Sequence, residues 1–567
     1  MTKTLTNYDP AEPLRILLMR SGGHFASTDF PDAPMVGPPK SLLYLAGVFA
    51  DDPGVRVRML DVLAHPDFEQ IARDRENPPF YFGMSEPDVA KRLAAERPHV
   101  VGITSTANYY FEDTIRLIAL VRAICPDALI LLGGPDATND TARYFERAPA
   151  LDAIVLREGE RTFRHLITAL REGRDWSDVR AIVRREGDGL VRTDGEPFAV
   201  ELDEFRCDYS IADLERYFEL ARRGYPSRLG IQYPGSHRSI DLVTSRGCVY
   251  RCTFCCIYLH MGRRFRVHSV QRVLAEMRAL VETHGVRNFH FEDDDLLGDL
   301  PRFKEILRGI IEAGWDITWD TPNGVRADRI DEELMNLCRR SGCAYLIFGI
   351  ESGSARVRDK LIRKDMSLED VERACRLCFE YEIDSLGYYM FGIPGETQAE
   401  MRETYDFAFR LFREYNCTPV FQIWRPYRNT PLEKKVRDTA RISAPKIYTV
   451  ARSHGLPYAL FYSLVYQDDE VTLDFLAKHF DDYIRDALKV AILNWLRITS
   501  RRPASFLETV ASLARIVAGS VRTPIPARTM LQGYLHSVGL TPFAQMRGLG
   551  REPLRVVRDR PRAGVKS

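Results

Sequence analysis

The first third of the chain alternates between short apolar runs and stretches whose apolar residues recur at helical spacing. Residues 14–19, LRILLM, form the first run, and the turn Gly22-Gly23 follows shortly after it. Strands that alternate with helices form a parallel, doubly wound sheet, which binds ligands at the carboxyl ends of its strands. The pattern therefore predicts an α/β, Rossmann-like sheet with strands at residues 14–19, 55–60, 100–104, 129–132 and 153–156.

A second alternating pattern begins near residue 240. Its apolar runs predict strands at residues 241–244, 288–291, 317–320, 345–348, 385–391 and 420–424. Helical patterns separate them at residues 270–284, 302–313, 331–340, 368–381 and 399–414. Six strand–helix repeats predict a partial (β/α)₆ barrel, related to the TIM barrel, with its catalytic groups at the carboxyl ends of the strands.

The remaining segments suggest how the chain is divided. A helix at 162–172, a hairpin at 179–192 and a Pro- and Tyr-containing stretch near 225–235 follow the first sheet. The last segment reads as mostly helical, with apolar-rich stretches at 487–496 and 507–517. We therefore expect a first domain at 12–205, a linker at 206–235, a barrel at 236–435 and a helical region at 436–567.

Composition narrows the class of protein. The chain has 567 residues, which is too long for a single hydrophobic core, so we expect several domains. Its 79 Lys and Arg residues are balanced by 79 Asp and Glu residues. With no net positive charge, the protein has no overall electrostatic attraction for nucleic acid or for an anionic membrane surface. The N-terminus lacks a signal-peptide pattern, and no apolar stretch approaches the roughly 18 residues of a membrane span. We expect a cytoplasmic protein that acts on a small molecule; nothing in the sequence indicates its oligomeric state.

Four of the 11 cysteines lie between residues 248 and 256. Cys248, Cys252 and Cys255 have the spacing C-x₃-C-x₂-C and follow the first predicted barrel strand. Three thiolates can hold three irons of a [4Fe–4S] cubane and leave the fourth iron open. The alternatives are a zinc loop, which normally uses four ligands, or buried free cysteines. Cys256 does not fit the spacing, so we predict a structural role for it.

With this triad in this position, the sequence resembles the radical S-adenosylmethionine (SAM) superfamily, in which the open iron chelates the amino and carboxylate groups of SAM. The resemblance implies contacts to the adenine, the ribose or the methionyl ammonium from Phe254, from Asp293 or Asp294, from the FGxES segment with Gly349, Glu351 and Ser352, and from the turn with Gly392, Pro394 and Gly395. Packing of Phe254, a capping box at Glu351 and a helix N-cap at Thr397 are the structural alternatives.

The N-terminal region resembles the corrinoid-binding domain of one radical SAM branch, which includes class B methyltransferases and the anaerobic Mg-protoporphyrin ester cyclase. Segments 37–46, 133–138 and 157–163 carry this resemblance, which spans about residues 12–435. It implies cobalamin contacts from the loops at the sheet edge, with Ser105, Thr106, Asn108, Gly133, Gly134, Pro135, Glu158 and Gly159. Tight turns alone would also explain the glycines.

The corrinoid motif D-x-H-x-x-G is absent, because His65 follows Asp61 at a different spacing. We therefore expect no histidine from that motif on cobalt, and a nucleotide tail inserted between the Gly-rich loops and the sheet. Cys375 and Cys378 share a helix face three residues apart, and this spacing favours core packing over a second cluster.

The resemblance implies an enzyme that uses a [4Fe–4S] cluster, SAM and cobalamin, with an external electron donor of flavodoxin or ferredoxin type. It does not assign catalytic side chains. The preferred function is methyl transfer to an unactivated carbon of a small natural-product or lipid-like substrate. A cyclisation or oxidative rearrangement with the same cofactors is the first alternative, and a non-catalytic corrinoid or Fe–S sensor is the second.

Overall fold

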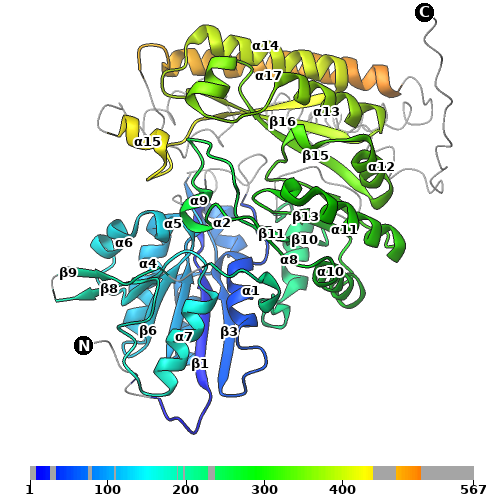
Figure 1. Cartoon of the computed structure of the whole chain (residues 1–567). Coiled ribbons are helices and arrows are strands. Elements are labelled where there is room, and N and C mark those ends of the chain that lie inside the picture. Colours follow the sequence, from blue (N-terminus) through cyan, green and yellow to red (C-terminus); the bar gives the residue numbers. More distant parts are fainter. Residues whose placement is uncertain are drawn as a thin grey trace, which may run out of the picture.

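The computed structural model describes residues 5, 8–25, 34–74, 79–107, 110–187, 189–195, 198–227, 237–437 and 468–499. Within these residues the chain forms two α/β units, each built on one large sheet (Figure 1). The first sheet has seven strands in the order β3-β1-β5-β6-β7-β8-β9. Their bounds are β1 Leu14–Arg20, β3 Val55–Asp61, β5 Val100–Thr104, β6 Leu129–Gly133, β7 Ala153–Val155, β8 Ile182–Glu186 and β9 Gly189–Arg192.

The first five strands of this sheet are parallel, and β8 and β9 add an antiparallel hairpin at one edge. Both faces of the sheet are covered at β1, β5, β6 and β7, which explains why these strands read as continuous apolar runs, whereas the edge strand β3 has exposed positions. Ile16 and Leu18 pack with α1 (Lys40–Gly47) and α7 (Glu160–Arg171). Leu17 packs on the opposite face with α3 (Glu86–Glu96), α4 (Phe111–Ile124) and α6 (Thr141–Arg147).

The second sheet has six parallel strands in chain order. They are β10 Ser239–Leu242, β13 Asn288–Phe291, β14 Thr318–Asp320, β15 Cys343–Glu351, β16 Asp384–Phe391 and β17 Cys417–Ile423. The intervening helices are α10 Val270–His284, α11 Leu300–Ala313, α12 Glu332–Ser341, α13 Leu368–Glu380 and α14 Gln398–Tyr415. This is the arrangement predicted for a partial (β/α)₆ barrel, with β10 beginning two residues earlier than expected.

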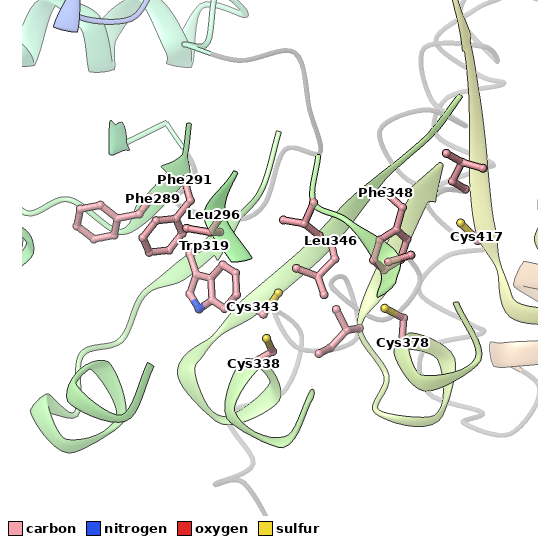
Figure 2. Close-up of a cluster of buried hydrophobic side chains, with 14 of the residues drawn as sticks. Phe289, Phe291, Leu296, Trp319, Cys338, Cys343, Leu346, Phe348, Cys378 and Cys417 are labelled. Carbon is pink, nitrogen blue, oxygen red and sulfur yellow. The ribbon is translucent and has the colours of Figure 1, made fainter. Parts of the chain in front are cut away.

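The outer face of the barrel sheet carries its core. Phe289, Phe291 and Trp319 pack among the side chains beneath α11, and Figure 2 shows buried cysteines in the same cluster. Cys375 and Cys378 are both fully buried in this core, as predicted. Their burial among apolar side chains gives them a packing role.

Two further elements refine the predicted organisation. Helix α8 (Leu214–Arg222) lies inside the predicted linker and contacts both units: Arg216 donates to the Ala64 carbonyl at 3.0 Å, and Phe218 joins the barrel core. A short antiparallel pair, β2 Gly23–Phe25 and β4 Phe80–Phe82, was not predicted, because its strands have only three residues each.

The C-terminal helix α17 (Leu473–Thr499) lies along α14 (Figure 1). Tyr405 donates to Asp486 at 2.9 Å, and Asn494 donates to the Phe412 carbonyl at 2.6 Å. The predicted helical stretch 487–496 falls within α17, whereas 507–517 lies outside the described residues. Among the helices described, none has the length and hydropathy to cross a membrane.

Candidate cofactor site

A cavity of about 530 Å³ lies where the two units meet. Such a volume is within the usual range for small-molecule sites, roughly 300–1,000 Å³. Its lining comes from the carboxyl ends of β5, β6 and β7 in the first unit, and from β10, β13 and the segment that carries the cysteines in the second. One cavity therefore faces both the Gly-rich loops and the barrel.

The cavity continues down between the first sheet and two of its helices. Leu42 and Leu45 of α1 and Phe163 of α7 line it from one side, and Gly102 and Leu131 line it from the sheet. An apolar slot beside a sheet suits a flat heteroaromatic ring. The geometry thus fits the expected insertion of the cobalamin nucleotide tail.

The Gly133-Gly134-Pro135 loop forms the mouth of this slot. Gly134 has φ +100°, and a Cβ on it would lie 2.4 Å from the Ser105 carbonyl oxygen. Only glycine tolerates both this positive φ and this close approach to the Ser105 carbonyl oxygen, so position 134 requires a residue without a side chain. This cradle fits a large ligand that approaches the backbone closely.

Most of the residues predicted to bind cobalamin line the cavity. These are Thr106, Gly133, Gly134, Pro135, Glu158 and Gly159. Ser105 does not line it: the Ser105 hydroxyl instead lies 2.7 Å from that of Tyr144, on the side of α6. Asn108 lies outside the described residues.

The three cysteines of the triad share one loop, which runs from β11 (Ser245–Arg246) to α9 (Ile257–His260). Burial raises the pKa of Cys248 to about 11, and it also raises the pKa values of Cys252 and Cys255. Partly buried thiols with raised pKa values resist ionisation in the absence of a cation, and iron supplies the charge that stabilises their thiolates. The donor set therefore fits a metal cluster.

No group of three His, Cys, Asp or Glu side chains converges on a single metal position within the described part of the chain. This result is compatible with a cubane, because each cysteine of a [4Fe–4S] cluster binds a different iron.

Two carboxylates after β13 hold the start of the cysteine loop. Asp293 accepts hydrogen bonds from the Thr244 hydroxyl at 2.8 Å and from the Ser245 hydroxyl, and it is buried. Asp294 accepts from the Gly247 amide at 3.1 Å, and burial raises its pKa to about 6. Both residues, predicted as SAM contacts, thus also fix the backbone immediately before Cys248.

Glu351 lies at the end of β15 with φ +69°, a strained conformation for a residue other than glycine. Its carboxylate accepts from Lys364 at 3.0 Å. Burial opposes the charge on Lys364, but Glu351 and Cys252 outweigh it and raise the pKa of this lysine. No motif in the sequence pointed to Lys364, which brings a cation to Glu351 and acts electrostatically on Cys252 of the cysteine loop.

The predicted adenine contacts also come together. Phe254 packs in a cluster with Ile393, which belongs to the turn that contains Gly392, Pro394 and Gly395. Thr397 caps α14 in a capping box with Glu400, so the structural role considered for this threonine is confirmed. Ser352 is buried, and its hydroxyl lies 3.0 Å from that of Thr404 on α14.

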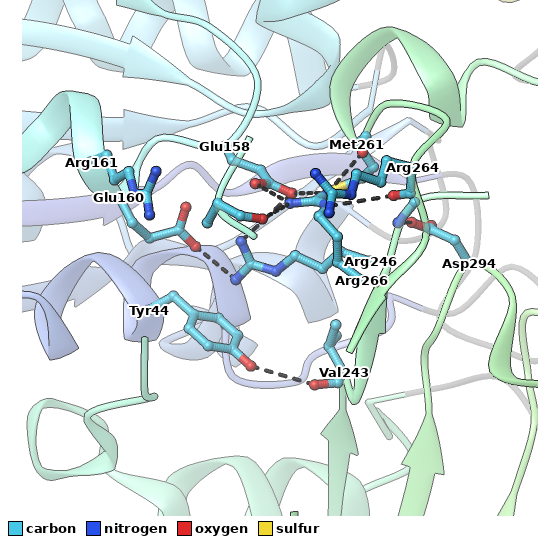
Figure 3. Close-up of polar contacts among 12 residues, drawn as sticks. Tyr44, Glu158, Glu160, Arg161, Val243, Arg246, Met261, Arg264, Arg266 and Asp294 are labelled. Carbon is cyan, nitrogen blue, oxygen red and sulfur yellow. Dashed lines mark hydrogen bonds and ion pairs between the residues drawn. The ribbon is translucent and has the colours of Figure 1, made fainter. Parts of the chain in front are cut away.

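A buried ionic clasp joins the two units beside the cavity (Figure 3). Arg246, two residues before Cys248, donates to Glu160 at 2.7 Å. Arg266 donates to both oxygens of Glu158, at 2.6 and 2.7 Å. Burial opposes the charge on Arg246, but Glu160 outweighs it and raises the pKa of the guanidinium. The clasp therefore remains ionised and ties the cysteine loop to the cavity wall.

The barrel lumen has a polar side and an apolar side. Asp241, His290, Asp320 and Tyr345 form one row across β10, β13, β14 and β15, in register. The His290 ring lies 2.7 Å from Asp320. The apolar side continues on β15–β17 with a cluster of Ala344, Tyr345, Ile347 and Leu386, against which Tyr388 and Val420 pack.

Fold and site together define an α/β protein in which the two ends of a three-thiol loop, Arg246 and His260, line a cavity between two α/β units. Residues 242–408 match the Radical SAM superfamily, and residues 32–167 match the B12 binding domain. The chain belongs to the B12-binding radical SAM family. It is a cobalamin-dependent radical SAM enzyme whose cofactors are a [4Fe–4S] cluster, SAM and cobalamin, so the sensor alternative is set aside.

Named relatives carry out different reactions. The chain is 31% identical to the cytidylyl-2-hydroxyethylphosphonate methyltransferase of Streptomyces wedmorensis over 409 residues, 66% of this chain and 74% of the relative. It is 27% identical to the anaerobic magnesium-protoporphyrin IX monomethyl ester cyclase of Rubrivivax gelatinosus, over 61% of this chain and 60% of the relative. Its fold is similar to that of the methyltransferase TsrM from Kitasatospora setae, with TM-score 0.62, 20% identity and coverage of 84% of this chain and 91% of that one.

Proposed function

We propose that the protein is a C-methyltransferase that acts on an unactivated carbon of a small natural-product or lipid-like substrate. The observation that carries this proposal is that one cavity joins the Gly133–Pro135 cradle to Asp241 and Glu292 of the barrel. A substrate at the barrel mouth would lie between the cluster loop and the corrinoid, in reach of both. The similarity to a methyltransferase at 31% identity supports the same reaction type.

When bound, the cluster and SAM supply a 5′-deoxyadenosyl radical and methylcobalamin supplies the methyl group, with two electrons per turnover from an external donor of flavodoxin or ferredoxin type. The residues of this chain position these groups. Cys248, Cys252 and Cys255 would bind the irons. Glu351 and Lys364 would meet the charged methionyl end of SAM, and Phe254 would lie against its adenine.

The lumen supports a substrate of mixed character. Its polar row, with Asp241 and His290, can hydrogen-bond a polar head, whereas Ile347, Leu386 and Val420 can contact an apolar part. Such a lumen orients the substrate, because it is unfavourable to bury the polar head against the apolar side chains or the apolar part against the polar row.

The stoichiometry of SAM tests the reaction type. With reduced, reconstituted enzyme and methyl-labelled SAM, we expect two SAM molecules per product: one yields 5′-deoxyadenosine, and the other yields S-adenosylhomocysteine and passes its labelled methyl group to the substrate. An unlabelled, dehydrogenated or ring-closed product, formed without S-adenosylhomocysteine, would reject methyl transfer and favour cyclisation or rearrangement.

A further inference from the structure

His260 lies at the end of α9, the short helix that directly follows the cysteine loop. Among the described residues that line the cofactor cavity, it is the one histidine. It comes from the barrel unit, whereas the Gly133–Pro135 cradle belongs to the cobalamin unit. The missing D-x-H-x-x-G motif gave no reason to expect a histidine here.

The His260 ring is buried, with 6% of the residue exposed. Its Nδ1 atom has no hydrogen-bond partner among the described residues. Burial lowers the pKa of His260 to about 4, and no charged group contributes to this shift. A buried polar nitrogen without a partner costs free energy, so a native structure usually supplies one.

The segment that carries His260 is held from both units. Arg266 donates to the carbonyl of the next residue, Met261, at 2.8 Å while it binds Glu158 of the cobalamin unit. Helix α9 also packs against α5 (Pro135–Asn139), which begins in the cradle loop. The position of the imidazole is therefore fixed relative to the cavity wall, as a preorganised ligand contact requires.

We propose that His260 binds cobalamin directly, through a hydrogen bond from its neutral imidazole to an oxygen of the corrinoid periphery. The acceptor is either a carboxamide of the corrin ring or the phosphodiester of the nucleotide tail, since both offer exposed oxygens. This contact makes the cluster-bearing segment part of the corrinoid site. It depends on cobalamin binding alone and not on the proposed methyl transfer.

The test compares His260→Leu, which keeps bulk but removes both nitrogens, with His260→Gln, which keeps a neutral hydrogen-bonding group. His65→Leu is the matched control, because His65 is half-buried in the cobalamin unit but does not line the cavity. Each reconstituted protein is titrated with aquocobalamin under anaerobic conditions, and bound cofactor is followed by absorbance. We expect about tenfold weaker binding for His260→Leu, a change within about threefold for His260→Gln, and none for His65→Leu.

Cobinamide, which lacks the nucleotide tail, identifies the acceptor. A loss in His260→Leu that persists with cobinamide assigns the contact to a corrin carboxamide, whereas a loss seen with aquocobalamin alone assigns it to the phosphodiester. Both outcomes support the proposal. Wild-type affinity should also be flat between about pH 6 and pH 8, because the imidazole is neutral throughout this range.

Three results would overturn the proposal. In the first, His260→Leu binds aquocobalamin as tightly as the wild type. In the second, the Leu and Gln variants lose affinity equally and both melt at a lower temperature without cobalamin, which would show a packing role. In the third, the spectrum of bound cob(II)alamin has nitrogen superhyperfine splitting that disappears in His260→Leu, which would place the ring on cobalt and not at the periphery.

Discussion

The two units meet at the same cavity, but they present different chemistry to it. At the cradle and the slot the cobalamin unit offers backbone and apolar surface, with Gly133, Gly134 and Pro135 at the mouth and Leu42 and Phe163 deeper in the slot, and its charged lining residues lie around them. The barrel unit lines the cavity mostly with polar side chains, Asp241, Arg246, His260 and Glu292, and it carries the cysteine triad on the loop between Arg246 and His260. The difference follows the ligands: cobalamin is large and mostly neutral, whereas the cluster and SAM carry charge.

This comparison also explains how the units are joined. Glu158 and Glu160 lie on the cobalamin side of the cavity, yet their carboxylates bind Arg266 and Arg246 of the barrel unit. The buried carboxylates of the cobalamin unit are thus neutralised by arginines of the barrel unit. The cavity wall and the cluster loop become one structure.

The largest effect is expected at the cysteines, because cluster binding by the barrel unit depends on three sulfur atoms. Replacement of Cys248, Cys252 or Cys255 by Ala should abolish the cluster and SAM cleavage, because each thiolate binds its own iron. Cys256→Ala is the adjacent control and should retain both. Iron content and 5′-deoxyadenosine formation after anaerobic reconstitution measure this. Loss of cleavage in Cys256→Ala with retention in Cys255→Ala would mean that the ligands are wrongly assigned.

An added methyl group should weaken cobalamin binding at the cradle glycine of the cobalamin unit but not at a comparable glycine of the barrel unit. Gly134→Ala places a methyl group 2.4 Å from the Ser105 carbonyl oxygen, so the cradle loop must move, and aquocobalamin binding should weaken by roughly tenfold or more. Gly395→Ala also has a positive φ, +82°, but its new methyl group meets nothing within 4 Å. It should cost only about 1 kcal/mol of backbone strain and leave cobalamin binding unchanged. Equal binding by both variants would contradict the steric account.

Local sequence patterns predict the sheets of both units, but they do not predict the contacts between distant elements. Regular apolar runs specify both sheets, and the cysteine spacing specifies the cluster loop, because local patterns determine them. The clasp of Arg246 with Glu160 joins residues 86 positions apart, and the pairing of Glu351 with Lys364 depends on a bend after β15. Ser105 reads as a cavity residue, but its hydroxyl turns toward Tyr144. Such contacts depend on packing between elements, which local patterns do not encode.

The clasp should be the main determinant of how the units hold together. Glu160→Gln removes the nearer of the two carboxylates beside the buried Arg246 and leaves Glu158 at 3.9 Å, so we expect a loss of about 3 kcal/mol in the free energy of unfolding. Urea titration of the cobalamin-free protein measures this. The control is Glu204→Gln, which breaks the half-exposed ion pair between Arg161 and Glu204, and it should cost no more than about 1 kcal/mol.

A double variant separates charge from packing at the clasp. Glu160→Leu combined with Arg246→Met removes both charges and keeps apolar bulk, so it should recover most of the stability lost in Glu160→Gln. If the double variant is less stable than Glu160→Gln, the pair acts through its hydrogen-bond geometry and not through charge neutralisation.

The smallest effect concerns pH, and it has opposite signs at the interface and in the lumen. Burial, with Arg246 nearby, lowers the pKa of His268 to about 4, and this ring lies 3.3 Å from the Tyr44 hydroxyl of the cobalamin unit. Between about pH 6.5 and pH 4 the unfolded chain binds a proton at His268 that the folded chain excludes, so His268 should lower the free energy of unfolding by about 2 kcal/mol at pH 5.

His290 has the opposite effect. Burial opposes its charge, but Asp320 outweighs burial and raises the pKa of the ring. Its stabilising contribution is therefore present at low pH and declines as pH rises through the raised pKa. We therefore expect His268→Gln to flatten the loss of unfolding free energy between about pH 7 and pH 5, and His290→Gln to steepen it. Parallel pH profiles for the two variants would show that these histidines do not titrate as the structure requires.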